Sequence, residues 1–444
     1  MTTKIWSRLA LRDRLGFVAL VAIATWMGRE HSTPDGPPTL WYRGGRVFGI
    51  PMQYVVLAAV VAVLIPFVRS RTMPFPIEKT MRYLKMFGWL IAGGIAILIS
   101  FSGALVGDAN NLFIDWRNIA VVMAVTWAAT RWLGGREWAG IMLLDLAVVY
   151  GLLSIGPLFG FAFGRGSVSL GTTIAIFSSE ILTLSAFGAI VTTAVWVFGL
   201  NSFPRWYAHL VIAASVLSSL LVALSFRRGY WLIWVLGVGT VSLLGVRRAG
   251  VQRAAVPLAM ASIVIIGSVI AFGTGNLALR LASFDPDADA RTNAFAATTS
   301  DHVNDIADAM DVIWASPITG LGMGVTYQTN RISAWKTESF VVHSAPVHVW
   351  LKFGVLGLIA YLGFHYAWIR ASFRRLDSVV SSVVMTATGV FVASEIVATL
   401  FATWPYGRFQ VSIHHGILLA ALLVVTAQHF EPAPLQSDRD ALPA

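Results

Sequence analysis

Long apolar stretches dominate this chain and restrict the folds that it can adopt. About twelve windows are close to 20 residues long, the length of helix that crosses roughly 30 Å of hydrocarbon. Only 12% of the 444 residues are charged and 57% are hydrophobic, whereas soluble proteins carry about a quarter charged residues. We therefore expect an all-α polytopic integral membrane protein that forms one membrane domain over residues 1–444. The expected spans are 12–28, 48–68, 86–106, 117–133, 138–160, 174–199, 205–225, 229–246, 254–273, 346–368, 379–403 and 410–428.

The distribution of Lys and Arg predicts the orientation. With the N-terminus in the cytoplasm, alternate connections are basic, as the positive-inside rule requires. Both termini are then cytoplasmic, and 431–444 is expected to be a disordered tail. The rule also explains the net charge of +10, so nucleic acid is not an expected partner. The first apolar run lacks a small-residue cleavage site and is expected to stay as a span. The absence of Cys excludes disulfides and thiolate catalysis.

The longest polar segment, residues 274–345, is expected to form an external loop between the ninth and tenth spans. Ser300 is a plausible N-cap for an amphipathic helix over about 300–316 that Pro317 ends. Val303, Ile306, Met310, Ile313 and Trp314 define its expected apolar face, with the Asp residues on the other side. Gly320, Gly322 and Gly324 then allow a tight backbone turn. The stretch DPDAD at 285–289 lacks the glycine and glutamate of a calcium loop, so no metal site is expected.

Arg227 and Arg228 lie in a short turn on the expected outer face, where the positive-inside rule does not account for them. One interpretation is that both side chains extend to lipid headgroups. Another is that they bind an anion, because guanidinium groups contact phosphate oxygens in pairs and stay charged.

His343 lies just before the tenth span, and Pro346 opens the helix after it. Imidazole titrates near neutral pH and is suited to proton transfer. His343 precedes Gly354 by eleven residues. The order of Pro317, Gly320 and Gly322, then His343, then Gly354 and Gly357 resembles the O-antigen ligase and O-antigen polymerase family. The resemblance covers most of the chain in architecture and about 45 residues in motif.

This resemblance implies an inverting, metal-independent glycosyltransferase without a cofactor in the inner membrane, with its active site facing the periplasm. It would transfer a glycan from an undecaprenyl pyrophosphate carrier to a glycan or glycolipid acceptor, as in lipopolysaccharide and polysaccharide biosynthesis. His343 would accept the proton of the acceptor hydroxyl, and Arg227 and Arg228 would bind the pyrophosphate. Gly320, Gly322 and Ser344 would support the site.

Two positions depart from the family pattern. His302 stands where a second arginine is usual, and the nearest candidate for that contact is Arg291, with Arg280 and Arg331 also in the loop. Ser344 stands where an asparagine usually follows the histidine. The second phosphate contact therefore rests on Arg291.

Charges inside the expected spans should face the bundle interior, because facing lipid is costly. Asp145, Glu180 and Glu395 are such residues. Glu395 either lines a substrate cavity or is the structural partner of a buried Arg or His. A polymerase of the same family is an open alternative to a ligase. A secondary transporter with twelve helices is an alternative of another class, as is a metal-dependent enzyme that uses Glu30 and Asp35.

Overall fold

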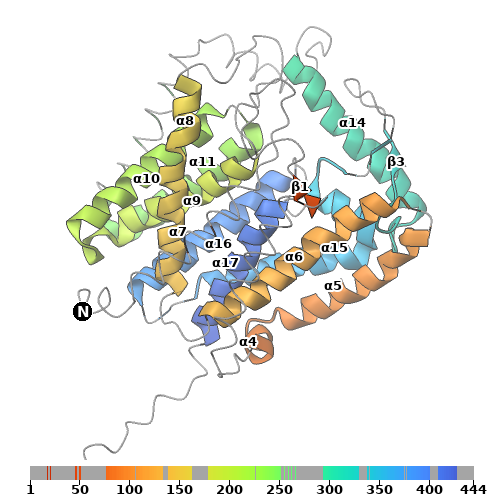
Figure 1. The fold of residues 1–444 in the computed structure, drawn as a ribbon, viewed down its shortest axis with the longest axis horizontal. Helices are drawn as coiled ribbons and strands as arrows, with labels where there is room; N and C mark the ends of the chain where they lie inside the picture. Colours follow the sequence, from red (N-terminus) through yellow and green to blue (C-terminus); the bar gives the residue numbers. More distant parts are fainter. Residues whose placement is uncertain are drawn as a thin grey trace, which may run out of the picture.

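A computed structural model of the chain is almost entirely helical (Figure 1). It describes residues 77–105, 107–133, 139–162, 179–225, 227–251, 294–329, 338–339, 341–374, 378–400 and 409–427. It also describes short pieces at 18, 21, 46–47, 50–51, 255, 259, 262, 266 and 376. Two small antiparallel pairs, β1 with β2 and β3 with β4, are the only sheets in this part of the chain.

The elements follow the apolar windows of the sequence. The helices are α4 (Ile77–Tyr83), α5 (Phe87–Ser100), η1 (Phe101–Leu105), α6 (Ala109–Leu133), α7 (Ala139–Leu153), α8 (Ile155–Ala162), α9 (Ser179–Phe198), η2 (Leu200–Ser202), α10 (Arg205–Leu224), α11 (Arg228–Ala249), α14 (Ala294–Ala315), α15 (Ala345–Ser372), α16 (Val379–Thr399) and α17 (Phe409–Ala427). The strands are β1 (Arg46–Val47), β2 (Ile50–Pro51), β3 (Tyr327–Gln328) and β4 (Glu338–Ser339).

Seven helical segments of the described residues are long and apolar enough to cross a membrane, or eight if the bent pair α4 and α5 is one span. The chain is therefore an all-α polytopic membrane protein, as predicted. The expected spans at 12–28 and 254–273 lie almost wholly outside the described residues, so the total of twelve stays a prediction. The span expected at 48–68 overlaps β2 at its start.

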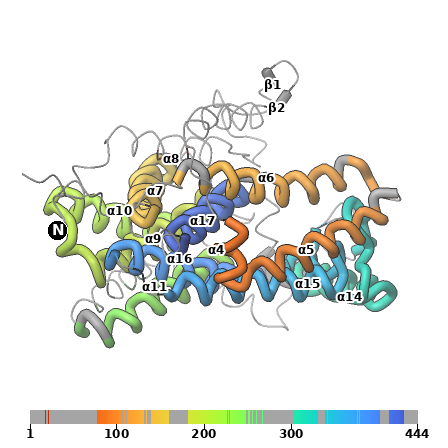
Figure 2. Tube along the Cα trace, turned by 90° about the horizontal axis from the view of Figure 1, so that it is seen from below, coloured from red at the N-terminus to blue at the C-terminus, as the bar shows by residue number. Residues whose placement is uncertain are grey.

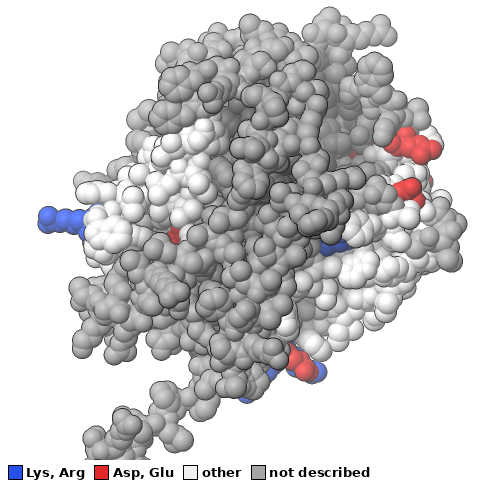
Figure 3. Space-filling model, viewed as in Figure 1, with Lys and Arg blue, Asp and Glu red and all other residues white. Residues whose placement is uncertain are grey.

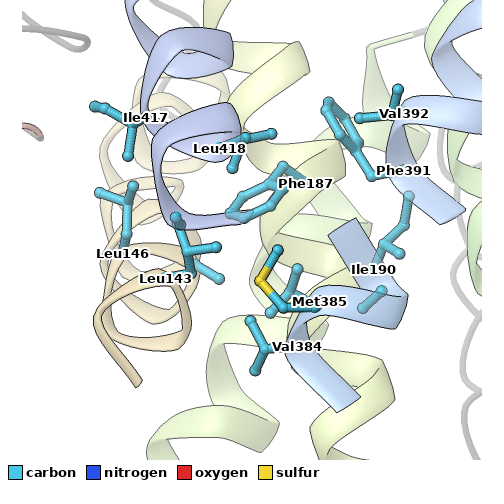
Figure 4. Packing of buried hydrophobic residues seen from close by; sticks show 14 of the residues in the cluster. Leu143, Leu146, Phe187, Ile190, Val384, Met385, Phe391, Val392, Ile417 and Leu418 are labelled. Atoms are coloured by element: carbon cyan, nitrogen blue, oxygen red, sulfur yellow. The ribbon is translucent and has the colours of Figure 1, made fainter. Parts of the chain in front are cut away.

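The central packing unit consists of α7, α9, α16 and α17, with α10 and α11 against α9. These helices enclose a cluster of buried apolar side chains, in which Phe187 of α9 lies among side chains of α16 and α17 (Figure 4). α9 is the most enclosed of the seven, with 89% of its apolar window buried inside the protein. Burial of this kind gives a span with no polar face.

A second group consists of α5, α6 and α15, with α6 packed on α17 and α15 packed on α5. In both ribbon and tube views α14 lies at one end of this group (Figures 1 and 2). α14 contacts α15 and β3. The segment that carries His343 is therefore held between α14 and the beginning of α15.

α14 differs from the expectation in two ways. It begins at Ala294, so Ser300 lies inside the helix and is not its N-cap. The preceding alanines are strong helix formers and extend it. The expected face is also wrong in part, because Val303 and Trp314 are 60% and 64% exposed whereas Asp305 is fully buried. A buried carboxylate needs partners, and Asp305 has them.

Candidate functional site

The turn with Arg227 and the segment with His343 lie at the same end of the helix bundle. Gly140, early in α7, packs against Ser381, early in α16, so these two helices begin at one end. α15 joins α16 through a short connection and therefore begins at the other end, where α7 finishes. Ser154 after α7 hydrogen-bonds Ser185 of α9 at 3.1 Å, so α9 begins there. Short turns link α9 to α10 and α10 to α11, which brings Arg227 to that end as well.

The arginines form the start of α11. Arg227 is its N-cap residue, half-buried, and its carbonyl accepts hydrogen bonds from the backbone N–H groups of Tyr230 and Trp231. Arg228 is the first helical residue. Arg291, together with Arg280 and Arg331, lies outside the described residues. The second phosphate contact that the resemblance implies therefore stays a prediction.

His343 is anchored by a buried carboxylate. Its Nδ1 lies 2.8 Å from Oδ2 of Asp305, and its backbone N–H donates to the same oxygen at 2.8 Å. The side chain of Asp305 is fully buried, whereas that of His343 is 26% exposed. Of the two side chains, only the imidazole of His343 is therefore accessible from outside the protein. Sequence reasoning missed Asp305 because it assigned the residue to a solvated face.

Two further side chains complete this constellation. The hydroxyl of Tyr327 donates to Oδ1 of Asp305 at 2.5 Å. The ring of His302 stacks on the ring of His343 with centroids 4.1 Å apart and planes 18° apart. His302 and Asp305 are three residues apart on α14 and therefore share a face. The same side of α14 therefore contacts the flat face of the His343 ring through His302 and its Nδ1 edge through Asp305.

The surface beside this constellation is acidic. Asp308 is half-buried on α14, and Asp311 and Glu338 are exposed. Acidic side chains gather at the edge of the molecule where α14 and β3 lie (Figure 3).

The glycine-rich turn at 317–324 docks into a break in α15. Gly354 has φ +68° inside the helix, which releases the carbonyl of Leu351 and the N–H of Val355 from the helical ladder. The N–H of Leu321 donates to Leu351 at 2.7 Å, and Val355 donates to the carbonyl of Pro317 at 3.1 Å. The backbone groups freed by the break are therefore satisfied by the turn.

Gly320 is required for this docking and Gly322 for the close approach of the turn to η1; both have positive φ. A Cβ on Gly320 would lie 2.6 Å from the carbonyl oxygen of Leu351, and one on Gly322 would lie 2.6 Å from Cα of Gly103. The expected tight turn is present at both positions. These glycines contribute to the site by positioning backbone.

A buried ion pair between α15 and α6 holds the C-terminal end of the glycine-rich turn. Nζ of Lys352 lies 3.3 Å from Oδ2 of Asp115, and the two side chains are 0% and 4% exposed. Nζ also donates to the carbonyl of Val325 at 2.7 Å. Oδ2 of Asp115 accepts the N–H of Gly324 at 2.9 Å. The sequence analysis singled out neither residue, although a lysine within an expected span is a signal of a buried partner.

The remaining candidates have structural surroundings. Ser344 is the N-cap residue of α15, is buried, and accepts the N–H of His348 through its carbonyl at 2.8 Å. Glu395 is buried and lies 2.6 Å from Nε2 of His415, which matches the structural alternative for this residue. Asp145 faces the interior and accepts the Tyr207 hydroxyl at 2.6 Å.

The site's chemistry is that of an imidazole oriented by Asp305 and His302. Within the described residues, no group of three or more His, Cys, Asp or Glu side chains could hold a metal ion. Glu30 and Asp35 lie outside the described residues. The described part therefore offers a proton acceptor in His343 and, at the same end of the bundle, the cationic start of α11.

Comparison with known families identifies the region that contains this constellation. The model of a family described as O-antigen ligase matches residues 213–362. The match begins within α10 and extends into α15, so it covers the arginine turn, α14, the glycine-rich turn and His343. The resemblance found in the sequence is confirmed. No curated protein matches the chain.

Proposed function

We propose that the protein is a membrane glycosyltransferase of the ligase type, because the model of the O-antigen ligase family matches residues 213–362. Its donor is a glycan on a polyprenyl pyrophosphate, undecaprenyl in bacteria, and its acceptor is a hydroxyl of a glycan or glycolipid. The reaction takes place on the outer face of the cytoplasmic membrane, with both chain termini in the cytoplasm.

The observation that carries this proposal is the His343–Asp305 pair. A general base must be accessible to the hydroxyl that it deprotonates and must be held in position. The imidazole of His343 is 26% exposed and its Nδ1 is fixed at 2.8 Å by a carboxylate that solvent does not reach. Nε2 is then the nitrogen that receives the proton.

In the proposed reaction the acceptor oxygen attacks the anomeric carbon and passes its proton to Nε2 of His343. The bond between that carbon and the pyrophosphate oxygen breaks, and the bond's electron pair leaves with the polyprenyl pyrophosphate. Attack opposite the leaving group inverts the anomeric centre. Fixed cations stabilise charge that develops on a leaving group, and Arg227 and Arg228 fill this role here. Arg291 is the candidate for the second phosphate contact.

Several observations favour an enzyme over a transporter. Transporter sites lie near the middle of the membrane between related halves. The polar constellation of this chain instead gathers around α14 and the first residues of α15, at one end of the bundle. The choice between ligase and polymerase depends on the acceptor, which is a lipid-linked core in the first case and a growing glycan in the second.

The test uses the full chain in lipid nanodiscs with a polyprenyl pyrophosphate-linked glycan and a panel of acceptors. We expect a new glycosidic bond and release of polyprenyl pyrophosphate. His343→Ala should lower turnover by about a hundredfold to ten-thousandfold, the usual effect of losing a general base. His209→Ala is the matched control, because His209 is exposed near the start of α10. Wild-type turnover in His343→Ala would remove this residue from the mechanism, and solute transport without bond formation would favour the transporter.

A further inference from the structure

The geometry points to α14 as the element that sets the tautomer and the ring plane of His343: we propose that Asp305 and His302 are positioning residues for this histidine. The inference rests on the proposed function, in which His343 is the general base. It adds two residues, three positions apart on one helix face, that act on His343 from different sides.

The hydrogen bonds of Asp305 determine which nitrogen of His343 carries the proton. An ionised carboxylate only accepts hydrogen bonds. Oδ1 accepts from the Tyr327 hydroxyl, and Oδ2 accepts from the His343 backbone N–H. The direction of both bonds is fixed, because a backbone N–H can only donate and an ionised carboxylate can only accept. Nδ1 of His343, at 2.8 Å from Oδ2, must therefore be the third donor, which leaves Nε2 of the neutral ring as the acceptor.

His302 restrains the plane of the His343 ring. A hydrogen bond at Nδ1 constrains the edge of the imidazole but leaves the ring able to rock about the bond. The His302 ring, 4.1 Å away and within 18° of parallel, blocks that motion on one face. Stacked aromatic rings attract one another beyond the effect of the area that they bury. His343 is thus held by its backbone, its edge and its face.

Tyr327 of β3 is the other partner of Asp305. It is 4% exposed, and its hydroxyl, which donates to Oδ1 of Asp305 at 2.5 Å, also lies 3.3 Å from the carbonyl oxygen of Val341. Tyr327 therefore contacts both the carboxylate and the segment that leads directly into His343. Tyr327 stabilises the position of Asp305, but it does not touch the imidazole nitrogen. This makes it a matched control for the effect of Asp305.

Asp305→Leu is the decisive variant, because it removes both oxygens and leaves Nδ1 of His343 without this acceptor. Asn is not suitable, because its amide oxygen would replace Oδ2 opposite the His343 backbone N–H and would still accept from Nδ1. In a serine protease, loss of the carboxylate that orients the histidine lowers kcat about 10⁴-fold. We expect kcat to fall by about 10²–10⁴-fold with little change in KM. Tyr327→Phe should destabilise the fold while its kcat stays within about tenfold of wild type, because Asp305 still accepts from Nδ1.

The spectroscopic readout is independent of activity. ¹⁵N-histidine NMR of the full chain distinguishes protonated from unprotonated ring nitrogens, and His343→Gln identifies the resonances. We expect Nδ1–H in the wild type and in Tyr327→Phe, and a shift to Nε2–H in Asp305→Leu. An Nε2–H tautomer in the wild type would overturn the inference, as would a tautomer unchanged by Asp305→Leu. Should Asp305→Leu fail to fold, the wild-type and Tyr327→Phe spectra decide alone.

The role of His302 is tested by a pair of substitutions. His302→Phe keeps a flat ring on His343 and should retain kcat within about threefold, whereas His302→Ala removes the ring and should lower kcat about tenfold, in line with one stacking contact. Equal loss in both would show that stacking is not its role. If wild-type protein forms no glycosidic bond, the proposed function fails, and the tautomer measurement still tests Asp305.

Discussion

Breaking the buried ion pair between Lys352 and Asp115 should be among the most damaging single changes in the described part of the chain. The two side chains are 0% and 4% exposed and their charged atoms are 3.3 Å apart. At an effective dielectric constant of about 20 the pair interacts by about 5 kcal/mol. Lys352→Met has similar volume but leaves the carboxylate of Asp115 buried without its cation. Removing one partner of a buried pair typically costs about 3–5 kcal/mol.

The assay is the free energy of unfolding in mixed micelles, measured by denaturing-detergent titration of the full chain. The double variant Lys352→Met with Asp115→Asn removes both charges and keeps an acceptor for the Gly324 N–H, so we expect it to recover most of the loss. Arg82→Met is the control, because the Arg82 pair with Glu78 is 63% and 65% exposed and should contribute at most about 1 kcal/mol. The reasoning is refuted if Lys352→Met loses no more than this control, or if the double variant is as unstable as the single.

Three other outcomes are expected. Gly354→Ala should prevent folding to a monodisperse species in size-exclusion chromatography, because its Cβ would clash with the carbonyl oxygen of Ile318 at φ +68°. The control Gly94→Ala, whose Cβ would meet nothing within 4 Å, should fold normally. Equal behaviour of the two variants would contradict the docking of the glycine-rich turn into α15. Glu395→Leu should lower the free energy of unfolding by about 1–3 kcal/mol, because Nε2 of buried His415 loses its bond to the carboxylate. Its turnover per folded molecule should be unchanged, and a kcat loss in fully folded protein would instead make Glu395 part of the site. Glycan transfer should persist after incubation with a chelator, and loss of transfer that added metal restores would refute the metal-independent scheme.

The helices could be predicted from the sequence because hydrophobic length alone determines a membrane span. The prediction of 205–225 for α10 and 410–428 for α17 differs from the structure by about one residue at an end. The predicted single span over 138–160 did not show the boundary between α7 and α8, where the Ser154 hydroxyl donates to the carbonyl of Tyr150 and also hydrogen-bonds Ser185 of α9. Hydropathy averages do not register such local hydrogen bonds.

The polar interior could not be predicted in the same way. Periodicity assigns every carboxylate to a wet surface, but Asp305 is enclosed by His343 and Tyr327, which are 38 and 22 residues away along the chain. Lys352 finds its partner in another helix, α6. These pairings depend on which loops meet in space, and one sequence does not encode that as a local pattern. His343 was singled out because it precedes an expected span and because the order of glycines around it resembles the O-antigen ligase and polymerase family; its role stays a prediction.

The docking of residues 317–321 into the break at Gly354 has a mechanical consequence. The glycine-rich turn and α15 share backbone hydrogen bonds, so we expect them to move together when α15 tilts. His343, the proposed base, would then keep a constant position along the axis of α15. A fixed position of this kind suits a lipid-linked substrate whose headgroup lies at a constant depth in the membrane.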